Sequence, residues 1–142
     1  MTAAGGGGPF RCVLRVRYAD TDQMGTAYYG TYLRWFEVGR TEMLRSLGMS
    51  YREVEGRGIR LPVVEARCRY GRPARYDDLL AIETTLARLG RASVRFEYCV
   101  RRAPDGELLA QGMTEHCFLG PAGKPVRPPA FLARMLERAP RP

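Results

Sequence analysis

Two carboxylates and a glycine stand close together where an alternating strand pattern ends, in Asp20-Thr21-Asp22 and Gly25. An aromatic-rich segment with a helical pattern begins a few residues later, at Gly30. A helix start offers unpaired backbone N–H groups and the positive end of the helix dipole. A carboxylate held near that positive end is placed for nucleophilic or general-base chemistry on a carbonyl group. Asp-x-Asp is also a common turn sequence, so the pair alone leaves a structural and a chemical interpretation open.

Other nucleophile and metal chemistries find little support in the sequence. The four cysteines are scattered without a Cys-x-x-Cys pair or zinc-ligand spacing, so we expect reduced thiols in a cytoplasmic protein and no metal site. No Gly-x-Ser-x-Gly motif is present. The only histidine, His116, neighbours Cys117 on a predicted strand, and the two side chains would therefore point to opposite faces. We expect His116 to be an ordinary strand residue.

The composition is that of one soluble globular domain with a basic surface. The chain has 142 residues, 45% of them hydrophobic, and a formal net charge of +8. Lys124 is its single lysine, and every other basic residue is an arginine. This charge favours a polyanionic partner: a nucleic acid, a membrane surface or a phosphate-bearing ligand. No window has the roughly 18 apolar residues of a membrane span, and the first residues lack a signal-peptide pattern.

Hydrophobic periodicity predicts one strand, a long helix, four more strands and a short helix. Gly48 is placed to end the long helix, and Asp105-Gly106 is a hairpin signal. A basic loop separates the long helix from the second strand. We expect a glycine-rich tail over 1–9, a single domain over 10–138 and a C-terminal tail over 139–142. The predicted strands cover 10–18, 62–70, 79–89, 94–101 and 108–119, and the predicted helices cover 30–47 and 131–136.

This order of elements predicts an α+β fold. Four consecutive strands with hairpin signals favour an antiparallel sheet, with the long helix lying across one face. The helix is apolar on more than one side around Leu33, Trp35 and Val38, so we expect it to be largely buried. One helix cannot cover both faces and both edges of such a sheet. We therefore expect a homo-oligomer that extends the sheet or pairs its bare face.

Two motifs resemble a known family. The first joins Arg15-Val16, Thr21-Asp22 and Gly25 to the segment 28–37, and the second is Pro-Ala-Arg-Tyr-Asp-Asp-Leu at 73–79. Both are similar to the 4-hydroxybenzoyl-CoA thioesterase-type hotdog proteins, and the likeness spans about residues 11–128. It implies a hotdog fold, an antiparallel β-sheet wrapped around one long central helix. It also implies the hydrolysis of an acyl-CoA thioester. From the uncovered sheet face and edge we expect a homotetramer, as a dimer of dimers, or at least a dimer.

The same resemblance assigns roles to particular residues. Asp22 is implied to be catalytic, either as nucleophile on the thioester carbonyl or as general base for a water. The backbone N–H groups of Tyr29 and Gly30 would hold the developing oxyanion. Gly25 would allow the tight turn beside Tyr28 in the substrate-binding segment. Asp20 would be structural, holding the turn that carries Asp22.

The resemblance also places the coenzyme A moiety. Arg91, Lys124 and Arg127 would contact its phosphates, and coenzyme A would enter only as part of the substrate, with no metal or redox cofactor. Relatives linked to a cell-envelope system often carry histidine at the position of Tyr29, whereas the aromatic-CoA branch carries tyrosine. The acyl group can be aromatic or aliphatic at this point.

Three alternatives remain at the level of sequence. Acyl carrier protein could replace coenzyme A, or the fold could bind acyl groups without turnover. The basic charge also suggests a nucleic-acid-binding module, which would need exposed rings for base stacking. Against that module, the rings on the strands share the apolar positions and are expected to be buried: Tyr18, Tyr70, Phe96 and Tyr98.

Overall fold

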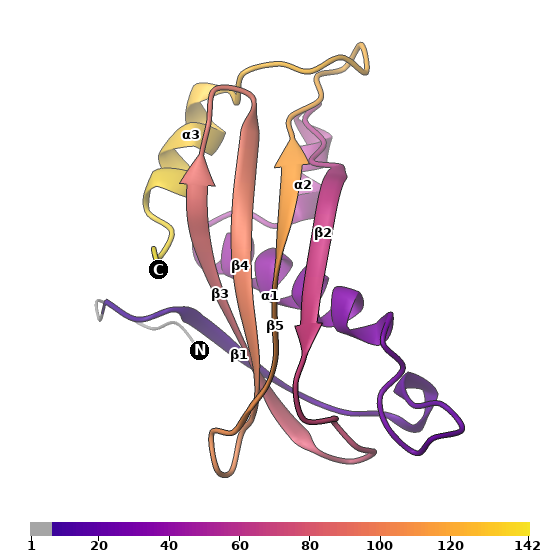
Figure 1. Cartoon of the computed structure of the whole chain (residues 1–142). Helices are drawn as coiled ribbons and strands as arrows, with labels where there is room; N and C mark the ends of the chain where they lie inside the picture. The colour runs from indigo at the N-terminus through magenta and orange to yellow at the C-terminus, as the bar shows by residue number, and fades with distance from the viewer. Residues whose placement is uncertain (1–6) are drawn as a thin grey trace.

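The protein folds around one five-stranded antiparallel sheet, as the sequence predicts (Figure 1). The computed structural model describes residues 7–142, so most of the predicted tail over 1–9 lies outside the described residues. The strand order across the sheet is β1-β3-β4-β5-β2. The strands are β1 (Phe10–Arg15), β2 (Val63–Tyr70), β3 (Leu79–Leu89), β4 (Ser93–Arg102) and β5 (Leu108–Cys117). β1 ends at Arg15, earlier than predicted, because Tyr18–Asp20 forms a 3-10 turn, η1.

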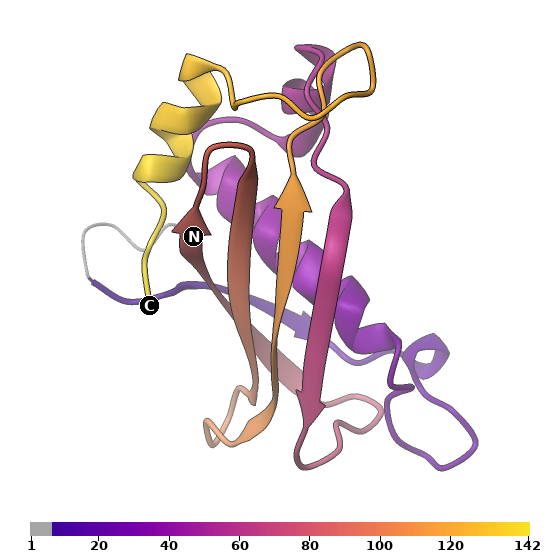
Figure 2. The ribbon, with the colours of Figure 1, turned by 45° about the horizontal axis from the view of Figure 1, so that its top comes forward.

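The long helix α1 (Thr31–Ser46) lies across one face of the sheet (Figures 1 and 2). Its side chains fill the core against the strands, and the Phe36 ring stacks on Tyr98 with ring centroids 4.4 Å apart. Gly39 lets the helix approach the sheet closely, because a Cβ there would lie 2.9 Å from a methyl group of Ile82. Gly48 has φ +117° and ends the helix as predicted. The sheet therefore wraps around one central helix.

Two short helices complete the fold. α2 (Tyr51–Gly56) was not predicted and replaces part of the expected basic loop; it begins with a capping box in which Ser50 accepts from Glu53 N–H at 3.1 Å. α3 (Ala130–Glu137) was predicted. The four residues assigned to a C-terminal tail also contact the domain. Ala139 is buried, and the Leu86 N–H donates to the Pro140 carbonyl at 2.8 Å.

The predicted burial is wrong for several apolar side chains. Phe96 and Tyr98 are buried, but Tyr18 is 80% exposed because its strand ends before it. Tyr70 is 46% exposed because β2 is an edge strand. Leu33 and Val38 of α1 are also exposed, on the helix flank that the single sheet does not cover.

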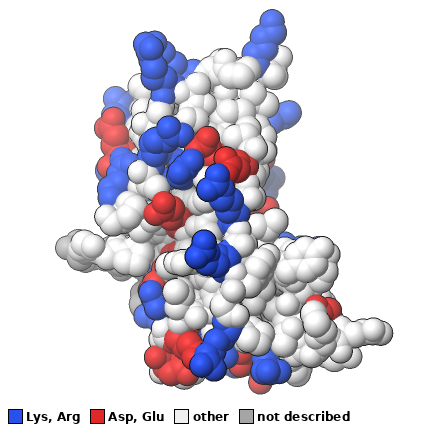
Figure 3. All heavy atoms as spheres, in the orientation of Figure 1, with Lys and Arg blue, Asp and Glu red and all other residues white. Residues whose placement is uncertain are grey.

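The face of the sheet turned away from α1 carries interleaved arginines and glutamates (Figure 3). Glu115 pairs with both Arg88 and Arg95, and Glu83 pairs with Arg101. Positive charge on this face is therefore largely neutralised within the chain. None of the helices in residues 7–142 combines the length and apolarity needed to cross a bilayer.

Candidate active site

Asp22 lies at the centre of a tight turn between η1 and α1. Its carboxylate accepts the Met24 N–H at 2.9 Å, and its carbonyl accepts the Gly25 N–H at 3.0 Å. Gly25 has φ +79°, a conformation that favours glycine, as the sequence indicated. The Asp22 side chain is half-buried rather than enclosed. One carboxylate oxygen is therefore engaged by the turn, and in the described residues the other has no hydrogen-bond donor.

Asp20 performs a different task from Asp22. It is 2% exposed, and its carboxylate accepts the Arg17 backbone N–H at 2.8 Å and pairs with the Arg17 guanidinium at 3.1 Å. Its carbonyl accepts from the Tyr28 N–H at 2.8 Å and from the Thr31 hydroxyl at 3.1 Å. Asp20 therefore ties the turn to the start of α1, in line with the structural role expected of it.

The start of α1 presents free backbone donors beside this turn. Within residues 7–142, neither the Tyr29 N–H nor the Gly30 N–H donates a hydrogen bond. The Tyr70 hydroxyl donates to the Tyr29 carbonyl at 2.7 Å. This carbonyl and the Gly30 N–H belong to one planar peptide group, so Tyr70 fixes the direction of that N–H. Partial desolvation of the hydroxyl, and secondarily its hydrogen bond with Cys68, raise the pKa of Tyr70 to about 12, so the hydroxyl stays a donor at neutral pH.

The Tyr28 ring lines the site, and the Tyr29 ring packs against it with ring centroids 4.5 Å apart. A Cβ at Gly30 would lie 2.8 Å from the Tyr28 ring, so any larger residue there would displace this exposed ring. Interaction with the Tyr29 side chain is the main cause that raises the pKa of Tyr28, and the nearby charge of Asp22 adds to it. The phenol of Tyr28 is therefore protonated at neutral pH.

Asp22 separates two open clefts. A cleft of about 400 Å³ runs from Asp22 toward the helix start and includes Tyr28, Gly30 and Arg34. A second cleft of about 490 Å³ lies on the other side, between Asp22 and the exposed rings of Tyr18 and Tyr76. The exposed aromatic side chains of this chain thus gather around Asp22 rather than on the arginine-bearing face of the sheet.

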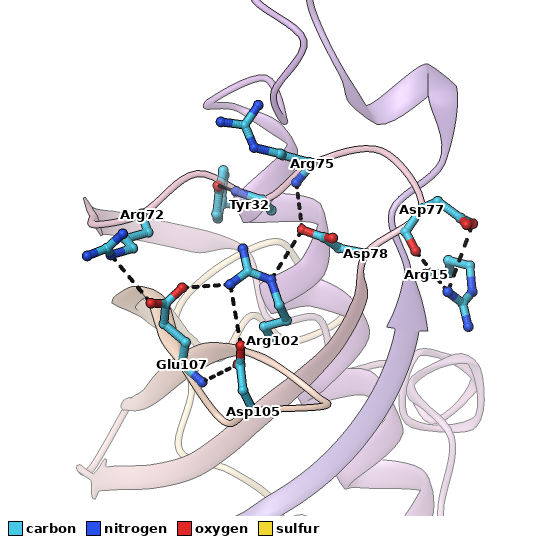
Figure 4. Close-up of polar contacts among 10 residues, drawn as sticks. Arg15, Tyr32, Arg72, Arg75, Asp77, Asp78, Arg102, Asp105 and Glu107 are labelled. Carbon is cyan, nitrogen blue, oxygen red and sulfur yellow. Dashed lines mark hydrogen bonds and ion pairs between the residues drawn. The ribbon is translucent and has the colours of Figure 1, made fainter.

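A network of ion pairs surrounds the loop before β3 (Figure 4). Arg102 pairs with Asp78 and Glu107, which joins the hairpin after β4 to the loop before β3. That loop holds the site directly, because the Ala27 N–H donates to the Ala74 carbonyl at 2.8 Å. The Tyr32 hydroxyl of α1 accepts the Ala74 N–H. The second sequence motif, 73–79, therefore positions the segment after Asp22 through these hydrogen bonds.

Three of the predicted site residues lie far from Asp22 in the same chain. Arg91 is in the turn between β3 and β4, and Lys124 and Arg127 are in the loop after β5, at the opposite end of the sheet (Figure 1). β3 has 11 residues, which at about 3.3 Å each span roughly 35 Å. One chain thus brings together Asp22, Gly25, Tyr28, Tyr29 and Gly30. It does not bring the three basic residues to them.

The sequence interpretation missed two residues of the site. Tyr70 was assigned to the buried face of its strand, although it orients the Tyr29–Gly30 peptide group. Arg34 lines the cleft at the first turn of α1, where its position one helical turn after Gly30 was the available signal. Across residues 7–142, no group of three or more His, Cys, Asp or Glu side chains is arranged to hold a metal ion.

Known proteins resemble this chain along most of its length. A family model described as thioesterase superfamily matches residues 24–109, more than half of the chain. The Bacillus subtilis protein YneP, which bears the name of an acyl-CoA thioesterase, is 34% identical over 80% of this chain and 83% of its own. An uncharacterised Thermus thermophilus protein of known structure is 35% identical, with a TM-score of 0.86 over 89% of this chain and 96% of its own. A DHNA-CoA thioesterase from Staphylococcus aureus is 30% identical, with a TM-score of 0.83 over 89% and 85% of the two chains.

Proposed function

Because this chain belongs to the thioesterase superfamily, we propose that it hydrolyses acyl-CoA thioesters to a free acid and coenzyme A, with Asp22 as the catalytic carboxylate. The observation that carries this proposal is the position of Asp22 in a cleft that Gly30 also lines, beside the free N–H groups at the start of α1. A thioester needs a nucleophile on its carbonyl carbon and donors for the oxygen that becomes negative. The Tyr29 and Gly30 N–H groups, aided by the helix dipole, supply those donors.

Two routes use the same groups. In one, an Asp22 oxygen attacks the carbonyl carbon, the C–S bond breaks to release the coenzyme A thiolate, and water hydrolyses the resulting mixed anhydride. In the other, Asp22 takes a proton from water as the water oxygen adds to the carbonyl carbon, and the tetrahedral intermediate then collapses with cleavage of the C–S bond to release the thiolate. The thiolate takes up a proton in both routes, and the products are the acid and free coenzyme A. Coenzyme A enters as substrate, and neither route needs a metal or redox cofactor.

Replacing Asp22 by asparagine tests the proposal. Asparagine keeps the shape but lacks both the negative charge and the basicity. We expect kcat to fall by about 10³, equivalent to roughly 4 kcal/mol of transition-state stabilisation, with little change in KM. Asp20→Asn is the matched control, because Asp20 holds the turn but does not line the cleft; it should lower stability more than rate. A near wild-type rate in Asp22→Asn would refute the role of Asp22.

A single turnover in H₂¹⁸O identifies the nucleophilic route when the label appears in Asp22. If Asp22 is the nucleophile, water can open the anhydride at the aspartyl carbon, and ¹⁸O then enters the Asp22 side chain. If Asp22 is a general base, all of the label enters the product acid. Mass spectrometry of the peptide that contains Asp22 reads out the difference. Rates of hydrolysis with the acyl group on acyl carrier protein test whether that protein replaces coenzyme A in the substrate. A chloroplast acyl-acyl carrier protein thioesterase of Arabidopsis thaliana is 26% identical over 84% of this chain.

We further propose that two copies pair through β2, and that two such dimers form a tetramer. β2 is an open edge whose Val63 and Val64 are 45% and 59% exposed, and Leu33 and Val38 of α1 are exposed as well. Antiparallel pairing would bury this strip and close the edge. Light scattering should then report a multiple of 16.0 kDa. Val64→Arg at the edge should shift the mass toward the monomer.

This pairing would also complete the binding of coenzyme A. Two antiparallel copies of β2 bring the loop end of one chain beside the Asp22 end of the other, so Arg127 of the partner subunit could reach the phosphates. Arg127→Ala should therefore raise KM more than it lowers kcat. Mixing Asp22→Asn with Arg127→Ala subunits tests the cross-chain arrangement. A heterodimer regains one intact site, with wild-type KM, only if Asp22 and Arg127 of one site come from different chains.

We place the protein in the cytoplasm, where acyl-CoA is available and thiols remain reduced. All four cysteines are free and half-buried. Burial is the main cause that raises the pKa of the Cys12, Cys68 and Cys99 thiols. These thiols are therefore neutral and poorly reactive at pH 7.

A further inference from the structure

A separate cavity of about 290 Å³ lies between α1 and the sheet, near the end of α1 that is remote from Asp22. Its walls are apolar where Leu44, Leu61 and Phe96 line it. Two polar side chains, Arg40 and His116, also line it, and Glu37 and Val63 stand among its outer residues. The cavity thus has the features of a small-molecule site: an apolar body with a few polar groups.

His116 contributes no free hydrogen-bonding group to this cavity. It is 1% exposed, its Nδ1 lies 2.9 Å from the Leu61 carbonyl, and its Nε2 lies 2.8 Å from the Thr114 hydroxyl. A carbonyl oxygen only accepts, so Nδ1 carries the proton and Nε2 accepts from Thr114. Thr114 in turn accepts from the Tyr98 hydroxyl at 2.5 Å. This chain of hydrogen bonds is complete and holds the cavity wall rigid.

Arg40 is different, because no carboxylate in the described residues pairs with it at hydrogen-bond distance. Its side chain is only 15% exposed, yet within residues 7–142 its sole ion pair is with Glu37, at 3.8 Å. That distance is too long for a hydrogen bond, and the Glu37 side chain is 67% exposed to solvent. A buried guanidinium is normally paired with an anion in bidentate contact. Arg40 also forms a hydrogen bond with the Tyr98 hydroxyl, and none of its nitrogens is both fully buried and unpaired. Among the described residues, however, no carboxylate lies within hydrogen-bond distance of its guanidinium.

The position of the cavity connects it to the proposed reaction. Arg40 is ten residues after Gly30 on α1, so it lies about 15 Å along the helix from the oxyanion donors of its own chain. Val63, at the start of β2, stands at the cavity, whereas Tyr70, at the end of β2, contacts the Asp22 site. Antiparallel pairing of two β2 strands places these two ends opposite each other. The cavity of one chain would then face the Asp22 cleft of the partner.

We propose that this cavity receives the far end of the acyl group, and that Arg40 selects acyl groups that end in a carboxylate. The proposal rests on the thioesterase function and the β2-paired dimer proposed above. A carboxylate is the acceptor that matches a guanidinium in two parallel hydrogen bonds. Glu37, the other charged residue of the cavity, opposes an incoming anion and would instead favour a hydroxyl group. Removing the Glu37 charge should therefore strengthen binding of an acyl group that ends in a carboxylate and weaken binding of one that ends in a hydroxyl.

The experiment compares adipoyl-CoA with hexanoyl-CoA, which have equal chain lengths and differ in the terminal carboxylate. We expect the wild-type enzyme to prefer adipoyl-CoA in kcat/KM by at least tenfold. Arg40→Met should lower this preference about 100-fold. Arg40→Lys should lower it by less, because lysine keeps the positive charge but cannot form the two parallel hydrogen bonds of a guanidinium. Glu37→Gln should increase the preference. Arg45→Met is the matched control: it lies on the same helix, is 63% exposed and does not line the cavity, so both activities should persist.

A binding measurement separates this proposal from the thioesterase function. Calorimetry with free adipate and hexanoate needs no turnover, and adipate should bind to the wild type and to Glu37→Gln but not to Arg40→Met. If Asp22→Asn stays active while adipate still binds through Arg40, the reaction mechanism fails and the cavity assignment stands. Equal kcat/KM for the two substrates, an unchanged preference in Arg40→Met or a reduced preference in Glu37→Gln would overturn the selection of a carboxylate. Dissociation of Arg40→Met to monomers would overturn it too, because Arg40 would then be an interface residue.

Discussion

Protonation of His116 should destabilise the folded protein, and acidification is the simplest perturbation that reveals it. The imidazole is enclosed between the sheet and α1, donates from Nδ1 to Leu61 and accepts at Nε2 from Thr114. A proton added to Nε2 would face the Thr114 hydroxyl, which already uses its oxygen to accept from Tyr98. The positive charge would also lie buried near the Arg40 guanidinium.

The structure sets the direction and the size of the effect. Burial, and secondarily the charge of Arg40, lower the pKa of His116 from 6.5 to about 4. The folded state therefore favours the neutral ring, and this contribution to stability is complete above pH 6.5. It is lost as the pH falls from 6.5 toward 4, where the folded protein also becomes protonated. A tenfold change in proton affinity is worth about 1.4 kcal/mol, so the whole contribution is roughly 3 kcal/mol.

Two measurements check this result. His116 is the only histidine, so one imidazole resonance in an NMR titration reports its pKa without ambiguity. Urea unfolding at several pH values between 7.5 and 4.5 should show a steeper loss of stability for the wild type than for His116→Gln, which cannot titrate. The difference between the two proteins removes the common contribution of the carboxylates. An imidazole that titrates near 6.5, or parallel stability curves for the two proteins, would refute the reasoning.

Three further substitutions probe the framework of the site and the fold. Tyr70→Phe removes the hydrogen bond that orients the Tyr29–Gly30 peptide group, which is worth about 1 kcal/mol, so kcat should fall about fivefold with KM nearly constant; steady-state kinetics decide this, and an unchanged kcat would contradict it. Gly112→Ala places a Cβ 2.7 Å from the Phe36 ring and should lower the free energy of unfolding by about 3 kcal/mol in urea titrations. Ser50→Ala removes the capping box of α2 and should lower the free energy of unfolding by about 1 kcal/mol in the same titrations. An unchanged free energy of unfolding would contradict it.

The sequence predicted most of the sheet because local signals were strong and consistent there. Alternating apolar residues located β3 over 79–89 with its correct limits, and Gly48, Gly106 and Gly25 all have the positive φ that their turn positions required. The capping box of α2 was also present in the sequence, as Ser50 and Glu53, but it was read as part of a basic loop. A helix of 6 residues gives too little periodicity to stand out.

Chain order alone settled which residues surround Asp22 locally. Gly25, Tyr28, Tyr29 and Gly30 follow Asp22 within eight positions, so a turn and a helix start were enough to bring them together. Burial and long-range partners depended on the position of each strand in the sheet, which periodicity does not encode. Alternation gave Tyr70 and Tyr98 the same assignment, yet β2 became an edge and β4 an inner strand, so one ring is exposed and the other is buried. Only the tertiary structure placed the Tyr70 hydroxyl on the Tyr29 carbonyl and separated Arg91 from Asp22 by the length of β3. It also placed Arg40 of α1 in one cavity with Phe96 and His116. These relations join residues far apart in the chain through the sheet order.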